Sequence, residues 1–495
     1  MKSISKSQYN RSLQCKKAFY LYRHRKDLLE YTSTQQKVMQ QGTSFGIYMQ
    51  QLFPGGVDVS QAAQSFGQKI SLTKALISEG KQPIYEATLS ANGFGVPLLC
   101  MVDILVPGEG GWHLYEVKSA TSVKPEYITD AGFQQFVAQQ MGVHVLSVNI
   151  IHVNNQYVRN GAIEIDKLGE IAEITANIKK AAIDVESELK ELKGVDALTD
   201  SPEVGIGAHC DTPYGCGFKN HCWKNVTKED SVFDFFSATK AIELYNQGMQ
   251  TMPSIPESYP FSGKIQTRFR AYQKKELLFN SEGVQAFIDE LTYPLYYLDF
   301  ETFMSAIPPY NTSRPYQQLC FQYSLHIQSE ANGNCIHKAF LANPDEGDSR
   351  IPFITQLIDD IGNKGSVIVY NIAFERKRLE EIGENFPEYA EACASINSRM
   401  IDLYIPFRDL DIYHPSMKGS ASIKSVLPAL VPALSYADLE VSQGGQAMDI
   451  YGNMVNHAYS SEEVKKLRKG LLEYCKLDTW AMVKLVEWLL KKRSA

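Results

Sequence analysis

The sequence predicts an α/β protein with more than one domain. Its 495 residues exceed what one hydrophobic core usually holds, so two or three domains are expected. Two short apolar strands with nearby carboxylates lie far apart, in residues 101–119 and 293–302, and helical patterns follow each of them. We expect an N-terminal domain over residues 1–223, a helical connector over 224–292 and a C-terminal α/β domain over 293–495.

The composition is that of an ordinary folded protein, with 44% hydrophobic and 21% charged residues. No basic start is followed by an apolar run, so we expect no signal peptide. The apolar stretch 426–434 is interrupted by Pro428 and Pro432 and is too short to cross a bilayer. Nine irregularly spaced cysteines argue against a secreted disulfide framework. A cytoplasmic protein without membrane contact is the expectation.

The charge is distributed unevenly along the chain. The formal net charge is −7, yet residues 1–37 carry nine Lys and Arg against Asp27 and Glu30, a net of +7, which leaves −14 on the remainder. A basic arm on an acidic body can hold phosphate groups near a metal site. A solvated helix face explains the same charges, and both interpretations stay open.

Residues 101–119 predict two strands joined by a Gly-rich turn. Glu116 and Lys118 share a face of the second strand, with Val117 turned into the core, because alternate side chains of a strand point the same way. Hairpin pairing can bring Asp103 from the first strand to that face. Two carboxylates and an ammonium group suit a bound Mg²⁺ or Mn²⁺, with the lysine stabilising phosphate charge. A surface hairpin with a solvated Glu–Lys pair is the alternative.

Asp103 and the run Glu116-Val117-Lys118 resemble the D…ExK motif of the PD-(D/E)xK nucleases, and within them the RecB-like exonucleases. The resemblance implies a restriction-endonuclease-like core. In such a core Asp103 and Glu116 hold the metal, and Lys118 takes part in phosphodiester cleavage.

The helix expected after this hairpin extends the resemblance. RecB-like enzymes often carry a catalytic-site Gln there, and Gln134 has that place in a helix expected to open at Asp130. The chain departs from the family at Ala138, where Tyr is usual, and residues 46–49 lack the upstream His ligand of many relatives. Glu86 is a further ligand candidate, with a solvated strand-end carboxylate as the alternative.

Three later cysteines, Cys210, Cys216 and Cys222, have a C-x5-C-x5-C spacing among Pro and Gly residues. Turn-forming residues let the backbone wrap a cluster and donate N–H groups to sulfur. With Cys15 near the start, the set resembles the iron–sulfur nucleases, which include the AddB nuclease domain and the CRISPR-associated RecB-like exonucleases. The resemblance implies that the four cysteines hold a [4Fe–4S] cluster.

A Cys₄ zinc site is the competing interpretation of these cysteines. His209 or His221 could then replace one thiol. Structural zinc sites usually show closer C-x2–4-C pairs, so this spacing favours the iron–sulfur cluster. Scattered free cysteines are a third interpretation.

Two intervening segments are expected to be scaffold. Residues 162–192 predict one or two amphipathic helices that cover the sheet, because Ile and Leu recur every three or four positions. The connector over 224–292 contains a loop marked by Pro253, Pro256 and Pro260.

A second set of carboxylates begins after the apolar strand 295–298. Asp299 and Glu301 share a strand face, and a later strand over 366–370 leads to Glu375. Tyr474 and Asp478 lie one helical turn apart and face the same way. Asp402 is an additional ligand candidate. Segment 419–424 could grip a phosphate at a helix start or simply cap that helix.

In this order the residues resemble the D-x-E, N-x-x-F-D and Y-x3-D motifs of RNase H-like, DnaQ-type 3′–5′ exonucleases. The resemblance implies an RNase H-like domain in which Asp299, Glu301, Glu375 and Asp478 hold two metal ions and Tyr474 orients the attacking water. Glu375 stands where the family usually has Asp. A degenerate domain retained for binding is the alternative.

Taken together, the resemblance implies a metal-dependent nuclease that hydrolyses phosphodiester bonds of DNA, in preference to RNA, at single strands or ends, with a second exonuclease-like site. The chain is similar to bacterial proteins whose second half is known only as a domain of unknown function. A helicase, or a defence or repair complex, is the kind of partner to expect. A nucleic-acid-binding or regulatory module with one or both sites inactive is the alternative.

Overall fold

The chain is a mixed α/β protein, and a computed structural model describes its residues 2–436, 441 and 443–493. It divides into two compact units. Unit 1 comprises Met1–Thr227 and Ala238–Asn246, and unit 2 comprises Lys228–Ser237 and Gln247–Ala495. The segment expected to be a connector is thus shared between the units. Within the described ranges, no helix combines the length and apolar character needed to cross a membrane.

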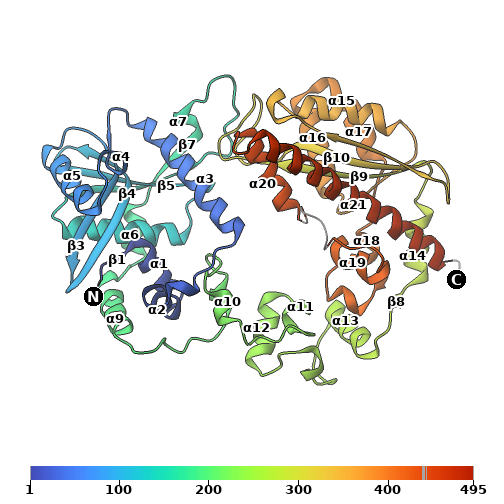
Figure 1. Cartoon of the computed structure of the whole chain (residues 1–495), viewed down its shortest axis with the longest axis horizontal. Coiled ribbons are helices and arrows are strands. Elements are labelled where there is room, and N and C mark those ends of the chain that lie inside the picture. Colours follow the sequence, from blue (N-terminus) through green and yellow to red (C-terminus); the bar gives the residue numbers. More distant parts are fainter. Residues whose placement is uncertain (1, 437–440, 442, 494–495) are drawn as a thin grey trace. The chain divides into compact units, whose positions relative to one another are not determined.

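Unit 1 is built on a seven-stranded mixed sheet with the order β2-β3-β4-β5-β6-β7, and β1 pairs alongside β4 (Figure 1). The predicted hairpin is confirmed, since β4 and β5 are antiparallel and close through Gly108 and Gly111. Gly110 in this turn has a φ of 77°, which glycine adopts without strain. The strands are β1 Ile4–Ser5, β2 Val57–Asp58, β3 Ile84–Gly93, β4 Val96–Gly108, β5 Gly111–Lys118, β6 Val145–Val153 and β7 Gly169–Glu173.

Helix α6, Pro125–Gln140, connects the parallel strands β5 and β6 and packs on β3, β4 and β6. It begins at Pro125, a favourable first residue because the first helical N–H has no partner to lose. Asp130 therefore lies inside the helix and does not open it. The other α-helices of unit 1 are α1 Lys6–Gln14, α2 Lys16–His24, α3 Ser33–Met49, α4 Val59–Ala62, α5 Phe66–Glu79, α7 Ile165–Leu168, α8 Thr175–Lys180, α9 Val185–Asp196, α10 Lys219–Cys222 and α12 Ala238–Asn246.

The prediction of only helices over 162–192 is wrong in the middle of that segment. Gly169–Glu173 forms β7, which pairs antiparallel with β6. Ile171, expected on a buried helix face, is 47% exposed. The edge of β6 offers backbone hydrogen-bond partners that a local hydrophobic period cannot register, so tertiary pairing overrides the helical pattern.

Unit 2 is built on a five-stranded sheet with the order β11-β10-β9-β12-β13. Strands β9, β10 and β11 are antiparallel neighbours, whereas β12 and β13 run parallel to β9. Their bounds are β9 Leu295–Phe303, β10 Leu319–Gln328, β11 Cys335–Leu341, β12 Ser366–Val369 and β13 Met400–Asp402. A separate pair is formed by β8 Leu278–Phe279 and β14 Ile412–Tyr413. The sheet is therefore mixed, and together with its helices it gives the α/β domain that was predicted for this half of the chain.

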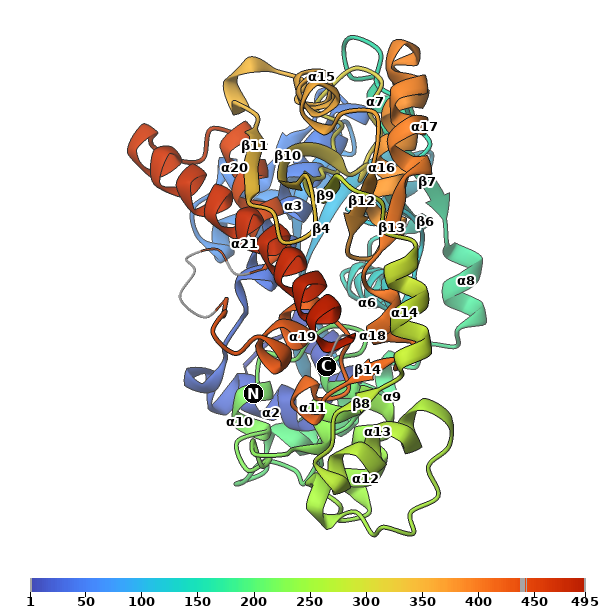
Figure 2. The same ribbon diagram turned by 90° about the vertical axis from the view of Figure 1, so that its right-hand side faces the viewer.

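Side chains of β9 alternate between two hydrophobic cores. Tyr296 and Leu298 pack with α15, α16 and α17, whereas Tyr297 and Phe303 belong to the core that contains α21. Figure 2 shows the long helix α21 running across β9 and β10. The α-helices of unit 2 are α11 Val232–Phe235, α13 Gly263–Lys274, α14 Ser281–Asp289, α15 Arg350–Ile361, α16 Ala373–Asn385, α17 Ala390–Ser398, α18 Ile405–Arg408, α19 Ile423–Leu430, α20 Gly444–Val455 and α21 Ser461–Arg493.

Candidate metal centres

The first candidate site lies in unit 1 where β4 and β5 separate. The paired register ends with Ile104 opposite Tyr115. Beyond this pair, Oδ2 of Asp103 accepts a hydrogen bond of 2.7 Å from the backbone N–H of Val117. The carboxylate of Asp103 thus accepts a hydrogen bond that a backbone carbonyl of the neighbouring strand would otherwise accept. This contact brings Asp103 to the end of β5 that carries Glu116.

Glu116 is the centre of this site and is only 2% exposed. Its Oε1 accepts hydrogen bonds from Nζ of Lys118 at 2.7 Å and from Nζ of Lys6 at 2.8 Å. Its Oε2 accepts a hydrogen bond of 2.5 Å from Nε2 of Gln134. Burial acts to raise the pKa of Glu116, but the charges of Lys118 and Lys6 overcome it and hold that pKa below its usual range. Glu116 is therefore an ionised carboxylate, and both of its oxygen atoms accept hydrogen bonds.

Asp130 is the third carboxylate of the site. Its Oδ2 accepts a hydrogen bond of 2.5 Å from Lys118, and its Oδ1 accepts one of 2.9 Å from Nδ2 of Asn10. Lys6, Asn10 and Asp130 were not predicted as site residues. A usable signal was present, because Lys6 and Asn10 are four residues apart on one helix, as are Asp130 and Gln134, so each pair faces the same way.

The predicted orientation of β5 is wrong. Val117 was expected in the core, but Trp112 and Leu114, on the same face as Glu116, are the β5 residues that join the hydrophobic core. Val117 is half-buried. The two lysines make it physically acceptable for Glu116 to share the core-facing side, because they compensate its buried charge.

Asp103 and Glu86 have pKa shifts opposite to that of Glu116. Burial, and after it the charge of Glu116, raises the pKa of Asp103 to about 8. Burial, followed by Asp58, raises the pKa of the half-buried Glu86, so the alternative of a fully solvated carboxylate does not describe it. Both groups would be stabilised in their ionised form by an added cation.

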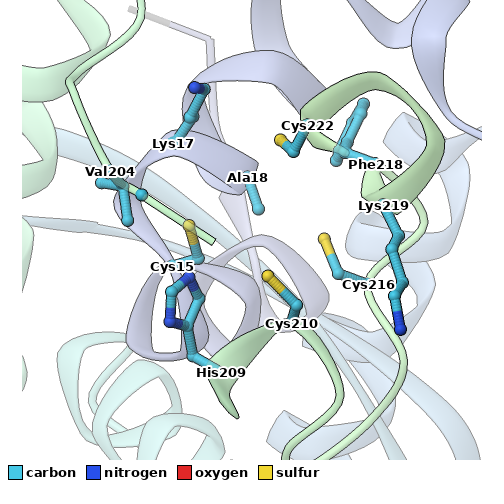
Figure 3. Close-up of a pocket in the computed structure, with 11 residues that line it drawn as sticks. Cys15, Lys17, Ala18, Val204, His209, Cys210, Cys216, Phe218, Lys219 and Cys222 are labelled. Carbon is cyan, nitrogen blue, oxygen red and sulfur yellow. The ribbon is translucent and has the colours of Figure 1, made fainter. Parts of the chain in front are cut away.

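The four cysteines singled out in the sequence line one small cavity of unit 1. Cys15 lies between α1 and α2, Cys210 ends a single 3₁₀ turn, and Cys222 ends α10. Figure 3 shows the sulfur atoms of these residues and of Cys216 pointing toward a common space. Residues 195 positions apart in sequence are therefore brought together, and His209 also lines the cavity.

Local contacts hold the cysteine loop against the first helices. Nε2 of Gln14 donates hydrogen bonds to the carbonyl oxygens of His209, at 2.7 Å, and Tyr214, at 2.6 Å. Burial raises the pKa of the Cys216 thiol, against a hydrogen bond from the backbone N–H of Phe218. Burial likewise raises the pKa of Cys222, against the charge of Lys17. A cation bound to sulfur would reverse both shifts.

The second candidate site lies in unit 2 between β9 and α21. Among the residues that the structure describes, the one set of three potential ligands within 4.8 Å of one another is Asp299, Glu301 and Cys475. Asp299 and Glu301 share the α21 face of β9, as the period of two predicts. Sγ of Cys475 lies 3.4 Å from Oδ2 of Asp299. Burial, then Asp299, raises the pKa of Cys475 well above its usual value, so the thiol is a donor to Asp299.

Glu375 and Asp478 bring two more carboxylates to this site. Burial raises the pKa of Asp299, Glu301 and Glu375 well above their usual values, and mutual repulsion adds to the shift of each. Burial raises the pKa of Asp478 to about 6. Oε2 of Glu375 is buried and has no hydrogen-bond partner among the described residues. Four carboxylates thus face one another from three elements, β9, α16 and α21.

Aromatic groups and one lysine complete the surroundings of Asp478. Tyr436 donates a hydrogen bond of 2.7 Å to Oδ1 of Asp478, and the hydroxyl of Tyr474 also acts to lower the pKa of this carboxylate. Nζ of Lys424, from α19, lies 5.0 Å from the ring centre of Tyr474 and 5.5 Å from that of Tyr436. Tyr436 was not predicted as a site residue, because no motif connects it to Asp478. Lys424 was named only as the end of segment 419–424, for which phosphate binding at a helix start was one of two interpretations.

Asp402 has a structural role that its motif did not suggest. Its Oδ1 accepts hydrogen bonds from the backbone N–H groups of Asn371, at 2.9 Å, and Tyr404, at 3.0 Å. Asn371 has a φ of 76°, in the left-handed region that Asn tolerates better than most residues. Asp402 therefore supports the turn that leads from β12 into the helix of Glu375.

Residues 296–422 match a family model described as a domain of unknown function, DUF2779. This segment contains Asp299, Glu301 and Glu375 and ends before Tyr474 and Asp478. The match covers part of the chain, within unit 2.

Among curated proteins, the chain is similar to two that are described as uncharacterized. The MG366 homolog of Mycoplasma pneumoniae is 24% identical over 291 residues, which cover 52% of this chain and 42% of that protein. UU173 of Ureaplasma parvum is 29% identical over 250 residues, 46% of this chain and 35% of that protein. The matched chain spans less than half the length of these relatives. Among solved structures, the crystal structure of SSO0001 matches at 11% identity with a TM-score of 0.18, over 37% of this chain and 96% of that chain.

Proposed function

We propose that the protein is a divalent-metal-dependent nuclease that hydrolyses phosphodiester bonds of DNA, with its main metal site in unit 2. The observation that carries this proposal is the convergence of four carboxylates, of which Glu301, Glu375 and Asp478 are buried and Asp299 is half-buried. Buried carboxylates repel one another unless protons or cations compensate them. Hard divalent cations prefer oxygen ligands of this kind.

The chemistry of the donor set fits such ions. Ligand atoms of Asp299 and Glu301 are within bridging reach of each other, and Glu375 has a buried oxygen without a partner among the described residues. The strand order β11-β10-β9-β12-β13, with the first three antiparallel and the last two parallel, supports an RNase H-like domain. Glu375 stands where the resembled exonucleases usually have Asp. Its longer side chain still places a buried carboxylate near Asp299.

When bound, two divalent ions would activate water and stabilise the leaving oxygen of a phosphodiester. Asp299, Glu301, Glu375 and Asp478 would hold them. Tyr474 lies one helical turn before Asp478 and acts to lower the pKa of that carboxylate, so its hydroxyl is close enough to orient an attacking water there. The ammonium group of Lys424 lies over the ring of Tyr474 and contributes positive charge that favours an approaching phosphate.

Unit 1 would supply a second hydrolytic site of the RecB-like, PD-(D/E)xK type on a restriction-endonuclease-like core. Asp103 and Glu116 are its metal ligands in this proposal, Lys118 stabilises charge on the phosphate, and Gln134 orients Glu116. Oε1 of Gln134 is buried without a partner among the described residues, so an acceptor is left over for water or substrate.

The cysteines of unit 1 would hold a [4Fe–4S] cluster. Cys15, Cys210, Cys216 and Cys222 line one cavity. Thiolates around zinc lie about 3.8 Å apart, as Zn–S bonds of 2.3 Å at tetrahedral angles require. No three of these four cysteines, all of which the structure describes, have sulfur atoms within 4.8 Å of one another, so they are less closely gathered than a tetrahedral zinc site requires. Zinc remains the competing occupant.

The test is cleavage of labelled single-stranded DNA by the full chain with Mn²⁺ or Mg²⁺, with EDTA as the metal-free control and RNA of the same sequence for comparison. We expect degradation that EDTA abolishes. An Asp299→Ala/Glu301→Ala variant should lose the unit 2 activity, and an Asp103→Asn variant the unit 1 activity. DNA that is bound but stays intact with every metal would instead support a binding or regulatory module. A helicase or a repair or defence complex as partner is part of the proposal and is tested by co-purification.

A further inference from the structure

The unit 1 site contains a second lysine, which comes from the start of the first helix. β1 pairs with β4 through Ser5 and Leu99, and Ser5 then caps α1 in a capping box with Gln8. Lys6 is therefore the first residue of a helix whose start is held on the sheet. From this base its ammonium group reaches Glu116.

Lys6 lies between two carboxylates of the site. Its Nζ is 2.8 Å from Oε1 of Glu116 and 3.9 Å from Oδ1 of Asp130. The same helix holds Asp130 a second time, one turn later, through Asn10. Lys118 bridges the same two carboxylates from the other side, at 2.7 Å and 2.5 Å. Two ammonium groups thus bridge a pair of carboxylates.

The charges of this site balance for a single divalent ion. Asp103, Glu116 and Asp130, when ionised, exceed the two lysines by one negative charge, and an ionised Glu86 raises this excess to two. One divalent cation then leaves the site with a charge of +1 or 0, which stays within one charge of neutral when a phosphodiester with a single negative charge binds. A second divalent cation would leave a buried excess of positive charge, which is costly in a weakly polar environment.

We propose that Lys6 takes the place of a second cation in the unit 1 site: it positions Glu116 and limits the site to one divalent ion. The inference rests on the proposed function of Asp103 and Glu116 as metal ligands. Lys6 acts through Glu116 and is a positioning residue. Its contribution distinguishes this site from the four-carboxylate site of unit 2, which would hold two ions.

Removing the charge of Lys6 should therefore separate metal binding from turnover. In Lys6→Ala, the loss of a neighbouring positive charge should tighten Mn²⁺ binding by about tenfold or admit a second ion. Cleavage by unit 1 should fall by about tenfold or more, because Glu116 loses one of its three donors. Lys6→Arg keeps the charge and should bind one ion and cleave almost as the parent does. If Lys6 had only a structural role, its variants would lose Mn²⁺ affinity and folding stability together.

The experiment uses the full chain with Asp299→Ala/Glu301→Ala, so that the unit 2 carboxylates contribute little. Bound Mn²⁺ is counted by electron paramagnetic resonance of the free ion, and folding is followed by circular dichroism. Lys6→Met, which removes the charge and keeps an unbranched side chain only one atom shorter, serves if Lys6→Ala unfolds. Lys2→Ala removes the same charge from an exposed position of the basic segment and should change nothing.

One ion in the parent, with tighter binding or a second ion in the Lys6 variants, supports the inference. Two ions in the parent, or Lys6 variants with unchanged Mn²⁺ binding, overturn it. Asp103→Asn reports on the proposed function separately. If it abolishes Mn²⁺ binding while the Lys6 variants change nothing, only the Lys6 inference fails. If Asp103→Asn has no effect on binding, the metal role of the unit 1 site fails as well.

Discussion

Tyr436 donates a hydrogen bond of 2.7 Å to Oδ1 of Asp478, across 42 residues of sequence. Both side chains are buried, and the hydroxyl of Tyr474, one helical turn before Asp478, also acts to lower the pKa of this carboxylate. Two phenols therefore act on Asp478. One of them belongs to the Y-x3-D motif, and the other is brought in by the fold. This arrangement allows the roles of the two hydroxyl groups to be separated.

Phenylalanine at either tyrosine removes one hydroxyl and leaves the ring in place. Tyr474→Phe should act mainly on the rate of DNA cleavage, reducing it by about 100-fold, because its hydroxyl is proposed to orient the attacking water. Its effect on metal affinity should be the smaller of the two, because Tyr474 lowers the pKa of Asp478 less than Tyr436 does. Tyr436→Phe should instead weaken Mn²⁺ binding, because its hydrogen bond favours the ionised form of Asp478. The measurements are single-turnover cleavage and Mn²⁺ titration in an Asp103→Asn background. Equal effects of both variants on rate and affinity would contradict the distinction.

The carboxylates of unit 2 predict a loss of stability as the pH rises. Burial raises the pKa of Asp478 from its usual 3.8 to about 6, so the folded state binds more protons than the unfolded state between these values. The free energy of unfolding therefore falls as the pH increases through this range, and the raised pKa values of Asp299, Glu301 and Glu375 extend the fall to higher pH.

A bound divalent cation should cancel this dependence, because it stabilises the ionised carboxylates. We expect the melting temperature of unit 2 in EDTA to be a few degrees lower near neutral pH than at about pH 5. Mg²⁺ or Mn²⁺ should restore it. Scanning calorimetry at matched ionic strength checks both effects. Asp478→Asn removes one titrating carboxylate and should reduce the dependence of the melting temperature on pH. A melting temperature that changes neither with pH nor on addition of metal would argue against a metal site here.

Lys118 is predicted to support the fold as well as cleavage. Its ammonium group is bound to Glu116 and Asp130, so Lys118→Ala leaves buried carboxylates without one of their cations. We expect a loss of about 3–5 kcal/mol in the free energy of unfolding of unit 1. Lys118→Arg keeps the charge and should recover most of the stability while cleavage by unit 1 stays low, because the guanidinium group cannot occupy the same point. Chemical denaturation and DNA cleavage measure the two quantities. Full activity in Lys118→Ala would assign cleavage elsewhere.

The cysteine site predicts a coloured protein. Anaerobically prepared protein should be brown, with a broad visible absorbance band and iron in place of zinc on metal analysis. Serine at Cys15, Cys210, Cys216 or Cys222 should remove the colour and the iron. Cys335→Ser, in a strand of unit 2, is the matched control and should retain both. A colourless protein that contains zinc would replace the iron–sulfur cluster by a structural zinc site.

Local patterns in the sequence were sufficient for several parts of the fold. The Gly-rich turn between β4 and β5, the shared face of Asp299 and Glu301, and the helix that carries Tyr474 and Asp478 all follow from short-range geometry. Strand β7 does not, because it depends on the edge of β6. The face of β5 was also assigned wrongly, since only the positions of Lys6 and Lys118 make a core-facing Glu116 acceptable.

By itself, the sequence determined which residue types were available at which spacing: the D…ExK run, the equally spaced cysteines and the three acidic motifs of the second half. Only the tertiary structure decided which distant groups meet them. Lys6 reaches Glu116, Gln14 holds the cysteine loop, and Tyr436 reaches Asp478. The reason is physical. Spacing along a strand or helix fixes the direction of a side chain within its own element, whereas its partners depend on how separate elements pack, and no local period encodes that packing.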